Sequence, residues 1–252
     1  MCTLAVYRGV SVAFPLIVVA NRDEFLARPA AVPARLATDS AIIAGLDLQS
    51  GGTWLGARTD GSARVAGILN RRPSPDHAAS GPGEITRGAL CMQALAAASA
   101  GVMRTLTAAE AQRYGGFSLF VADLEQAFVV DNGDGGVRVT ELAAGLSVLT
   151  NLDVNDPRCP RLATATQKFS ALTPLVEGAD SLGLLVPALA RVLSDHEGNA
   201  DAQGPGLFGK ICVHAGQYGT RSSSMIFVAG DGAVRYFHAE GHPCQAAFVR
   251  VN

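Results

Sequence analysis

Apolar residues form short, β-branched runs toward both ends of the chain and longer runs rich in alanine and leucine between them. Short runs bounded by turn residues are typical of strands, whereas the longer runs favour helices. Strands are predicted at residues 2–7, 16–20, 63–69, 117–122, 127–130, 137–142, 146–151, 212–214, 224–228 and 234–238. Helices are predicted at 84–100, 107–113, 160–171 and 181–193, and polar or Gly/Pro-rich loops at 74–83 and 196–206. Because strands and helices come in blocks and do not alternate strictly, we expect an α+β fold of antiparallel sheets covered by helices, in one domain spanning residues 1–252.

The first two predicted strands have a direct geometric consequence. The connection between them is shorter than the dozen or more residues that a parallel crossover needs. The strands are therefore expected to be antiparallel, so that the start of the first lies beside the end of the second. Cys2 is thus predicted to neighbour Asn21, Arg22 and Asp23.

Composition narrows the function classes. The chain has 252 residues, is 48% hydrophobic and has a mean hydropathy of +0.23, which is enough apolar material for a sizeable buried core. The net charge is −2, and the Lys and Arg residues are scattered. A basic patch is the electrostatic requirement for nucleic-acid binding, so no nucleic-acid partner is predicted.

Cysteine and histidine spacing gives no metal-binding motif. The cysteines are Cys2, Cys91, Cys159, Cys212 and Cys244. Their odd number, wide spacing and lack of a Cys-x-x-Cys pair argue against a zinc ribbon and against a disulfide framework. The five histidines show no His-Glu-x-x-His spacing. The sequence therefore predicts no metal site, no cofactor and a reducing compartment, the cytoplasm; a cysteine–histidine pair formed through space stays open.

The apolar run at residues 11–20 resembles the core of a signal peptide. It contains Pro15 and leads directly into the charged segment 21–24, so we interpret it as a strand. No apolar run is long enough to cross a bilayer, so no membrane span is predicted.

Cys2 is the most informative candidate for chemistry. Removal of Met1, which is common before a small residue, would give a terminal cysteine whose thiol titrates at about 8.5 and whose α-amine titrates at about 7.7–8.0. The amine can then take the thiol proton without a histidine. Arg22 would favour the thiolate, and Asp23 would hold the α-ammonium. The alternatives are that Cys2 is a small buried residue and that segment 21–24 is a solvated turn.

Four further positions are candidate site residues, each with a structural alternative. Trp54, in a glycine-rich segment that allows close backbone approach, either walls a substrate pocket or is a core aromatic. Asn70 and Asn151 each follow an apolar strand, where an amide can donate to an oxyanion or cap a turn. Arg221 lies in a polar run and can bind a carboxylate or stabilise a developing charge, unless the run is a surface turn.

Several segments together carry a family resemblance. They are Met1-Cys2, Asn21-Arg22-Asp23-Glu24 followed by Arg28-Pro29, Gly51 to Gly56, Asn70-Arg71, Tyr114 to Phe117, Thr150-Asn151 and Tyr218 to Ser223. In this order they resemble the NRDE family, which is similar to the transport and Golgi organization proteins of eukaryotes. The resemblance extends from Cys2 to about Arg235 and is weakest around residues 93–107.

The NRDE family in turn resembles the N-terminal-nucleophile (Ntn) hydrolases, and this implies an αββα four-layer sandwich of antiparallel sheets between helix layers. The resemblance implies that Cys2 is the nucleophile, with its own α-amine as the base. It assigns Arg22 and Asp23 to support of the nucleophile, although their spacing is tighter than in the cysteine amidases of that superfamily. Asn70 and Asn151 match oxyanion-side residues, and Arg221 matches a late arginine. Asn21 and Trp54 are assigned to the substrate pocket.

Two functions from different classes follow. The first is hydrolysis of an amide or thioester bond in a small acyl substrate by Cys2. The second is non-catalytic binding of an amphipathic ligand, haem or an acyl-lipid, in the same cleft, since family members have been linked to haem and lipid handling. A fold alone does not identify the substrate or the oligomeric state.

Overall fold

The computed structural model describes residues 2–72, 83–133, 136–156, 158–197 and 209–252. The chain forms two compact units, each with its own sheet and helices. The first unit contains the residues up to 28 and those from 144 onward, and the second unit contains residues 29–143. Most of the two predicted loops at 74–83 and 196–206 lies outside the described residues.

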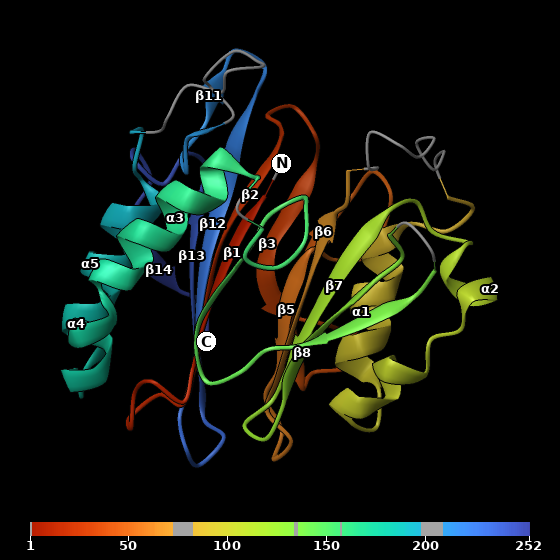
Figure 1. Cartoon of the computed structure of the whole chain (residues 1–252), viewed down its shortest axis with the longest axis horizontal. Coiled ribbons are helices and arrows are strands. Elements are labelled where there is room, and N and C mark those ends of the chain that lie inside the picture. Colours follow the sequence, from red (N-terminus) through yellow and green to blue (C-terminus); the bar gives the residue numbers. More distant parts are fainter. Residues whose placement is uncertain (1, 73–82, 134–135, 157, 198–208) are drawn as a thin grey trace. The chain divides into compact units, whose positions relative to one another are not determined.

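The sheet of the first unit joins strands from both ends of the chain, which Figure 1 shows as red ribbons beside blue ones. Its strands are β1 (Thr3–Arg8), β2 (Leu16–Phe25), β10 (Gly145–Leu149), β11 (His214–Ala215), β12 (Tyr218–Val228), β13 (Val234–Glu240) and β14 (Val249–Arg250). The order is β10-β1-β2-β12-β13-β14, with β11 paired to β12. β1 and β2 form the predicted antiparallel hairpin, in which Thr3 lies opposite Asn21. The start of the chain therefore lies beside the end of β2, as expected.

One face of this sheet is apolar and packs against helices. Ala5, Val19 and Met225 are register partners on neighbouring strands and are buried in one cluster with residues of the helices. The helices are α3 (Pro160–Ala171), α4 (Thr173–Gly178) and α5 (Leu182–Leu193), which cover one side of the sheet in Figure 1. The Tyr7 hydroxyl donates to the carbonyl of Phe169 at 2.6 Å and ties the hairpin to α3. Burial of each large apolar side chain contributes about 1.5–3 kcal/mol, so this face anchors the unit.

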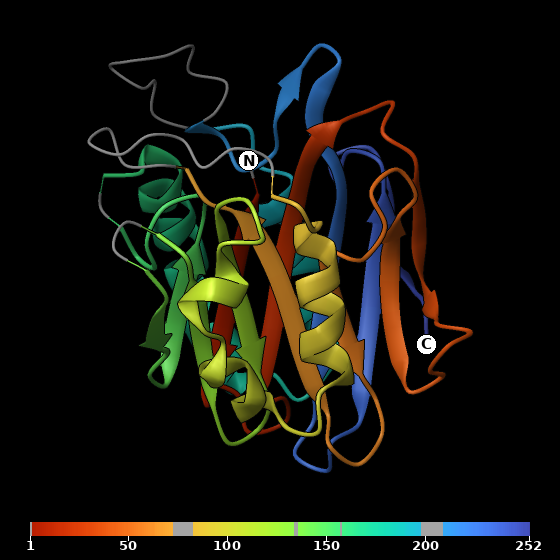
Figure 2. The ribbon, with the colours of Figure 1, turned by 90° about the vertical axis from the view of Figure 1, so that its right-hand side faces the viewer.

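The second unit contains a sheet whose strands pair in chain order. They are β3 (Ala30–Arg35), β4 (Ile42–Asp47), β5 (Leu55–Arg58), β6 (Arg64–Asn70), β7 (Phe117–Ala122), β8 (Ala127–Asp131) and β9 (Arg138–Glu141). Helix α1 (Arg87–Ala96) lies against β5 and β6 and buries Leu90 and Leu95 there (Figure 2). A 3-10 turn, η1 (Ala100–Thr105), and the short α2 (Ala108–Ala111) follow. Thr107 and Glu110 form a capping box at α2, in which the Thr107 hydroxyl accepts a hydrogen bond from the main-chain amide of Glu110.

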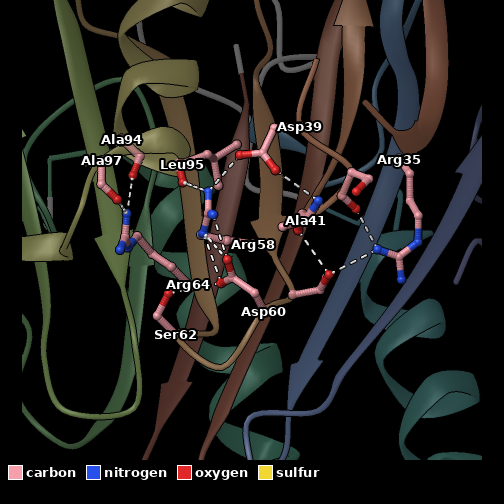
Figure 3. Close-up of polar contacts among 12 residues, drawn as sticks. Arg35, Asp39, Ala41, Arg58, Asp60, Ser62, Arg64, Ala94, Leu95 and Ala97 are labelled. Atoms are coloured by element: carbon pink, nitrogen blue, oxygen red, sulfur yellow. Dashed lines mark hydrogen bonds and ion pairs between the residues drawn. The ribbon is translucent and has the colours of Figure 1, made fainter. Parts of the chain in front are cut away.

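Two arginines organise the end of α1 (Figure 3). Arg64 is buried, and its Nη1 donates to the carbonyls of Ala94 and Ala97 at 2.9 and 2.8 Å. Arg58, which is closer to the surface, pairs with Asp39 and Asp60 at 2.9 and 2.6 Å. A cation at the last carbonyls of a helix satisfies unpaired acceptors and favours the helix dipole. The carbonyls of Ala94 and Ala97 accept hydrogen bonds from Arg64 where the helix ends.

The α+β fold with antiparallel sheets and helices is confirmed, since every pair of named strands in the described residues is antiparallel. The predicted helix at 84–100 is shorter, ending at Ala96 as α1. β3, β4 and α4 were not predicted, because their Ala-, Pro- and Gly-containing sequences lack a clear apolar period, and β14 was not predicted because it has only two residues. Among the described residues, no helix is both long and apolar enough to span a membrane.

Two alternatives from the sequence are wrong. Segment 21–24 is not a solvated turn, because it continues β2, and residues 21–23 are buried. The polar run that contains Arg221 is not a surface turn, because it forms the first half of β12. Two hydrogen bonds join the polar segments across the strands, from the Thr220 hydroxyl to Asp23 and from the Ser223 hydroxyl to Asn21.

Candidate functional site

Most of the predicted site residues lie at one end of the sheet in the first unit. Arg22, Ser222 and Glu240 are register partners on β2, β12 and β13. The first register pair of β1 and β2 is Thr3 with Asn21. Cys2 precedes Thr3 and Arg22 follows Asn21, so continuing the register places Cys2 opposite Arg22. The last register pair of β1 and β10 at this end is Leu4 with Leu149. Continuing it by two residues places Cys2 opposite Asn151. Extending the register gives one row of Asn151, Cys2, Arg22, Ser222 and Glu240, which we call the polar row.

The polar row lies on the face of the sheet that points away from α3 and α5. Its positions alternate with those of Ala5, Val19 and Met225, and successive side chains along a strand point to opposite faces. Arg22 and Asn151 are buried, with exposed fractions of 6% and 5%. The row therefore brings a thiol, a guanidinium and an amide to one end of a single sheet.

Cys2 is partly exposed and lies against the main chain of Asp23. Burial raises the pKa of the Cys2 thiol above its ordinary value, and the Asp23 carboxylate adds to the rise. The positive charge of the amino terminus, a hydrogen bond with the Asp23 main chain and the charge of Arg22 lower the pKa, in that order of size, but do not cancel the effect of burial. The thiol is therefore held in a defined place but is protonated at neutral pH unless a base acts on it.

Asp23 is the centre of a buried charged network on the helix side of the sheet. Its Oδ2 accepts a hydrogen bond from Arg161 Nη1 of α3 at 2.5 Å, and neither side chain is more than 2% exposed. Its Oδ1 accepts from the Thr220 hydroxyl at 2.7 Å, and its carbonyl accepts from Tyr218 Oη at 3.1 Å. A buried carboxylate requires this degree of pairing. Asp23 is thus fixed beside Cys2 by groups from α3 and β12.

Sequence reasoning did not identify Arg161. It lies 138 residues from Asp23 along the chain, on the inward side of a predicted amphipathic helix. A charged residue at an inward helical position is the signal that could have identified it, because Arg is almost never fully buried unless it is paired.

Asn21 is used by the protein itself. Its Nδ2 donates to the carbonyls of Leu193 and Ile211 at 2.8 and 2.9 Å, and its Oδ1 accepts from the Ser223 hydroxyl at 2.5 Å. Both amide hydrogens are therefore occupied. These bonds make Asn21 an anchor for the end of α5 and for the segment before β11, and they do not support the predicted contact with a substrate.

Arg221 belongs to a chain of contacts along β12 and β13. It lies at the irregularity between Thr220 and Ser222, and its Nη1 donates to Glu240 at 2.7 Å. Glu240 also lies 3.2 Å from His238 Nε2, and His238 Nδ1 lies 3.0 Å from the Ser224 hydroxyl. Burial lowers the pKa of His238, although Glu240 opposes this. A neutral imidazole that donates to Glu240 and accepts from Ser224 fits these contacts.

Asn70 and Trp54 belong to the second unit. Asn70 is exposed at the end of β6, opposite Phe117. The ring of Trp54 packs over Gly45 of β4, where a Cβ atom would meet a ring carbon at 2.6 Å. The roles assigned to them, an oxyanion donor and a pocket wall, stay predictions.

Similarity to known proteins extends over most of the chain. The chain matches the family model for Transport and Golgi organisation 2 over residues 1–242. It is 33% identical over 245 residues to the Transport and Golgi organization protein 2 homolog of Bos taurus and 30% identical over 248 residues to that of Homo sapiens. Both alignments cover 89% of this chain and 86% of the relative. A solved N-acylethanolamine-hydrolyzing acid amidase ortholog of Caenorhabditis elegans is similar with a TM-score of 0.46 and 14% identity, over 90% of this chain and 92% of that chain.

Proposed function

We propose that this chain, which belongs to the Transport and Golgi organisation 2 family, hydrolyses an amide or thioester bond of a small acyl substrate with Cys2 as the nucleophile. The observation that carries the proposal is the position of the Cys2 thiol, held against the main chain of Asp23 and beside the charge of Arg22. A nucleophilic thiol needs both a fixed place and a neighbouring positive charge.

The reaction divides into two steps. The sulfur of Cys2 attacks the acyl carbon, its proton passes to the base, and the tetrahedral intermediate collapses to a thioester as the amine or thiol leaves with that proton. Water then attacks the thioester, and the acid is released with the thiol restored. Asn151, the neighbour of Cys2 in the polar row, is the amide that we assign to the oxyanion of both intermediates.

Three charged groups have supporting roles in this proposal. Arg22 favours the thiolate, and Asp23, fixed by Arg161, orients the α-ammonium that forms at Cys2 after Met1 is removed. Arg221 is held by Glu240 and supplies positive charge at the far end of the polar row. Asp23 is a positioning residue in this scheme, since its carboxylate is already occupied by Arg161 and Thr220.

The raised pKa of Cys2 makes the base essential. Without a base the thiol is reactive only as the pH rises above the ordinary pKa of a cysteine, about 8.5. The α-amine of Cys2 itself, freed by removal of Met1, is the base that lies nearest to the sulfur. We therefore expect rapid reaction with an iodoacetamide-type probe at neutral pH only in molecules that lack Met1.

Substitution of the nucleophile tests the proposal. Cys2→Ala keeps a small second residue, so Met1 removal is unaffected, and it should lower turnover of any active amide or thioester by about 10⁴-fold or more. Cys91→Ala, which changes a buried thiol of α1 in the second unit, is the matched control and should keep turnover per folded molecule. Intact mass and peptide mapping of the probe should locate the label at Cys2. Full turnover by Cys2→Ala, or an inert Cys2 with Met1 retained, would refute the nucleophile.

A second function, the binding of an amphipathic ligand without catalysis, needs no thiolate and is therefore compatible with the raised pKa of Cys2. In that case Cys2 stays a protonated thiol at the end of the sheet. Titration with haem or an acyl-CoA should then saturate at micromolar concentration in both wild type and Cys2→Ala. Flat titrations would exclude this function, whereas turnover that depends on Cys2 would make it secondary.

A further inference from the structure

Four side chains of the first unit, two thiols and two imidazoles, bring one ligand atom each to within 4.8 Å of one another. They are His196, Cys212, His214 and Cys244. We propose that this thiol–imidazole cluster binds a zinc ion in tetrahedral coordination. The inference does not rest on the nucleophile proposed above, since Cys2 is not one of the four residues.

The distances within the cluster fit one ion. The two sulfurs, of Cys212 and Cys244, are 3.9 Å apart, and His214 Nε2 lies 3.7 and 3.3 Å from them. Zinc–sulfur bonds of about 2.3 Å and zinc–nitrogen bonds of about 2.0–2.1 Å at the tetrahedral angle separate two sulfurs by about 3.8 Å and a sulfur from a nitrogen by about 3.5 Å. The three distances therefore need to change by only a few tenths of an ångström around the ion.

The geometry also distinguishes this cluster from a disulfide. All five cysteines lie in the described part of the chain, and each is a free thiol. Bonded sulfurs are about 2.05 Å apart, so Cys212 and Cys244 at 3.9 Å are separated by nearly twice that distance. The distance between the two sulfurs is too long for a disulfide bond and matches that of two sulfurs bound to one ion.

Contacts around the cluster hold the ligands in orientations that suit a metal. His196 Nδ1 lies 3.1 Å from the carbonyl of Cys212, and a proton donated there leaves the lone pair on Nε2. Histidines that bind metals usually donate their other ring N–H to a carbonyl or carboxylate in this way. The amide of Cys212 donates to the carbonyl of Asp195 at 2.8 Å, and the ring of His214 lies 3.9 Å from that of His242. Main-chain and ring contacts thus fix both imidazoles.

The donor set selects zinc and a structural role. Two thiolates and two imidazoles in tetrahedral geometry are typical of zinc, whereas oxygen-rich sites suit magnesium or calcium. Four protein ligands complete the tetrahedron, so the ion has no position left for a reacting water. The site therefore ties chain segments together and does not activate a substrate.

Three segments meet at the cluster. His196 follows α5, Cys212 lies just before β11, which begins at His214, and Cys244 follows β13. The segment before β11 also carries the carbonyl of Ile211 that accepts from Asn21. Ion binding should therefore stabilise the part of the first unit that packs against the end of β2.

Metal content and a spectroscopic substitute test the site without any variant. Protein purified under reducing conditions should contain one zinc per chain, and Co²⁺ added after chelation should give the intense visible bands of tetrahedral thiolate coordination. Removal of zinc should lower the melting temperature, and Zn²⁺ alone should restore it. A chain that takes up neither metal, that contains iron with sulfide, or that isolates with a Cys212–Cys244 disulfide would overturn the proposal.

Variants then locate the site. Cys244 is exposed, so Cys244→Ser is not expected to unfold the chain, and it should weaken zinc binding roughly 100-fold, measured by competition with a coloured chelator. A matched control should bind as wild type: Cys159→Ser, which changes a free thiol outside the cluster. Wild-type affinity in Cys244→Ser, or an equal loss in Cys159→Ser, would overturn the assignment. Cys2→Ala should leave zinc binding unchanged, which separates this result from that of the nucleophile.

Discussion

Arg161 of the first unit and Arg64 of the second are buried to the same extent, each 2% exposed, yet their partners differ. Arg161 pairs with the carboxylate of Asp23, which lies beside Cys2. Arg64 donates to two carbonyls at the end of α1, and within the described residues it has no ion-pair partner. Burial of an arginine therefore does not by itself indicate function. A carbonyl partner marks the end of a helix, whereas a carboxylate partner here fixes a residue of the candidate site.

Among the substitutions that test this comparison, the one at Arg161 should lower the free energy of unfolding most. Arg161→Met leaves the buried Asp23 carboxylate without its cation, and removal of one partner from a buried pair costs about 3–5 kcal/mol. Urea unfolding should show a loss of that size. Arg191→Met, which changes an exposed arginine of α5, is the control and should stay within about 0.5 kcal/mol of wild type. A loss below about 1 kcal/mol for Arg161→Met would mean that Asp23 is stabilised mainly by Thr220 and Tyr218.

A double variant separates stability from function at the same pair. Asp23→Leu combined with Arg161→Met replaces both charges by apolar groups, and such replacements are often neutral or stabilising. The double variant should therefore regain most of the lost stability. Turnover dependent on Cys2 should stay low, because the carboxylate that orients the α-ammonium is gone. Recovery of both stability and turnover would assign the pair a purely structural role.

Arg64 is expected to have an intermediate effect. Arg64→Met removes two charge-assisted hydrogen bonds and leaves the carbonyls of Ala94 and Ala97 without this donor, which should cost about 2–3 kcal/mol of unfolding free energy. Arg64→Lys should recover part of the loss, since an ammonium keeps the charge but not the planar fork. Turnover per folded molecule should not change in either variant. A change in turnover would contradict the structural role given to Arg64.

The same contrast explains what the sequence could predict. Cys2 beside Arg22 and Asp23 follows from a short hairpin, so local connectivity was sufficient. Arg161 reaches Asp23 across 138 residues, and that contact depends on how α3 packs. Segment 21–24 was also open to a turn interpretation, because apolar periodicity ends where the buried positions of β2 become polar.

The thiol–imidazole cluster was missed for a related reason. Its ligands come from three segments, and only Cys212 and His214 are close together in the sequence, which is not one of the paired ligand spacings that identify a zinc site. Ligand spacing reveals a metal site when one loop or helix supplies neighbouring ligands. Here the packing of α5 and of the segments around β11 and β13 brings the ligands together, so the sequence alone predicted no metal.

The smallest expected effect is at Arg58, which pairs with Asp60 at the surface beside Arg64 (Figure 3). A hydrogen bond from Arg58 holds the pKa of Asp60 below its ordinary value. Asp60→Asn should cost less than about 1 kcal/mol, because the carboxylate is 42% exposed and screened by water.

Since the pKa of Asp60 is depressed in the folded state, the stabilisation is present above the ordinary carboxyl pKa of about 3.9 and is lost as the pH falls through the folded pKa. The difference in unfolding free energy between wild type and Asp60→Asn should therefore be constant from neutral pH down to about pH 5 and shrink below pH 4. It should also shrink in high salt, whereas the loss in Arg161→Met should not, because only the exposed pair is screened.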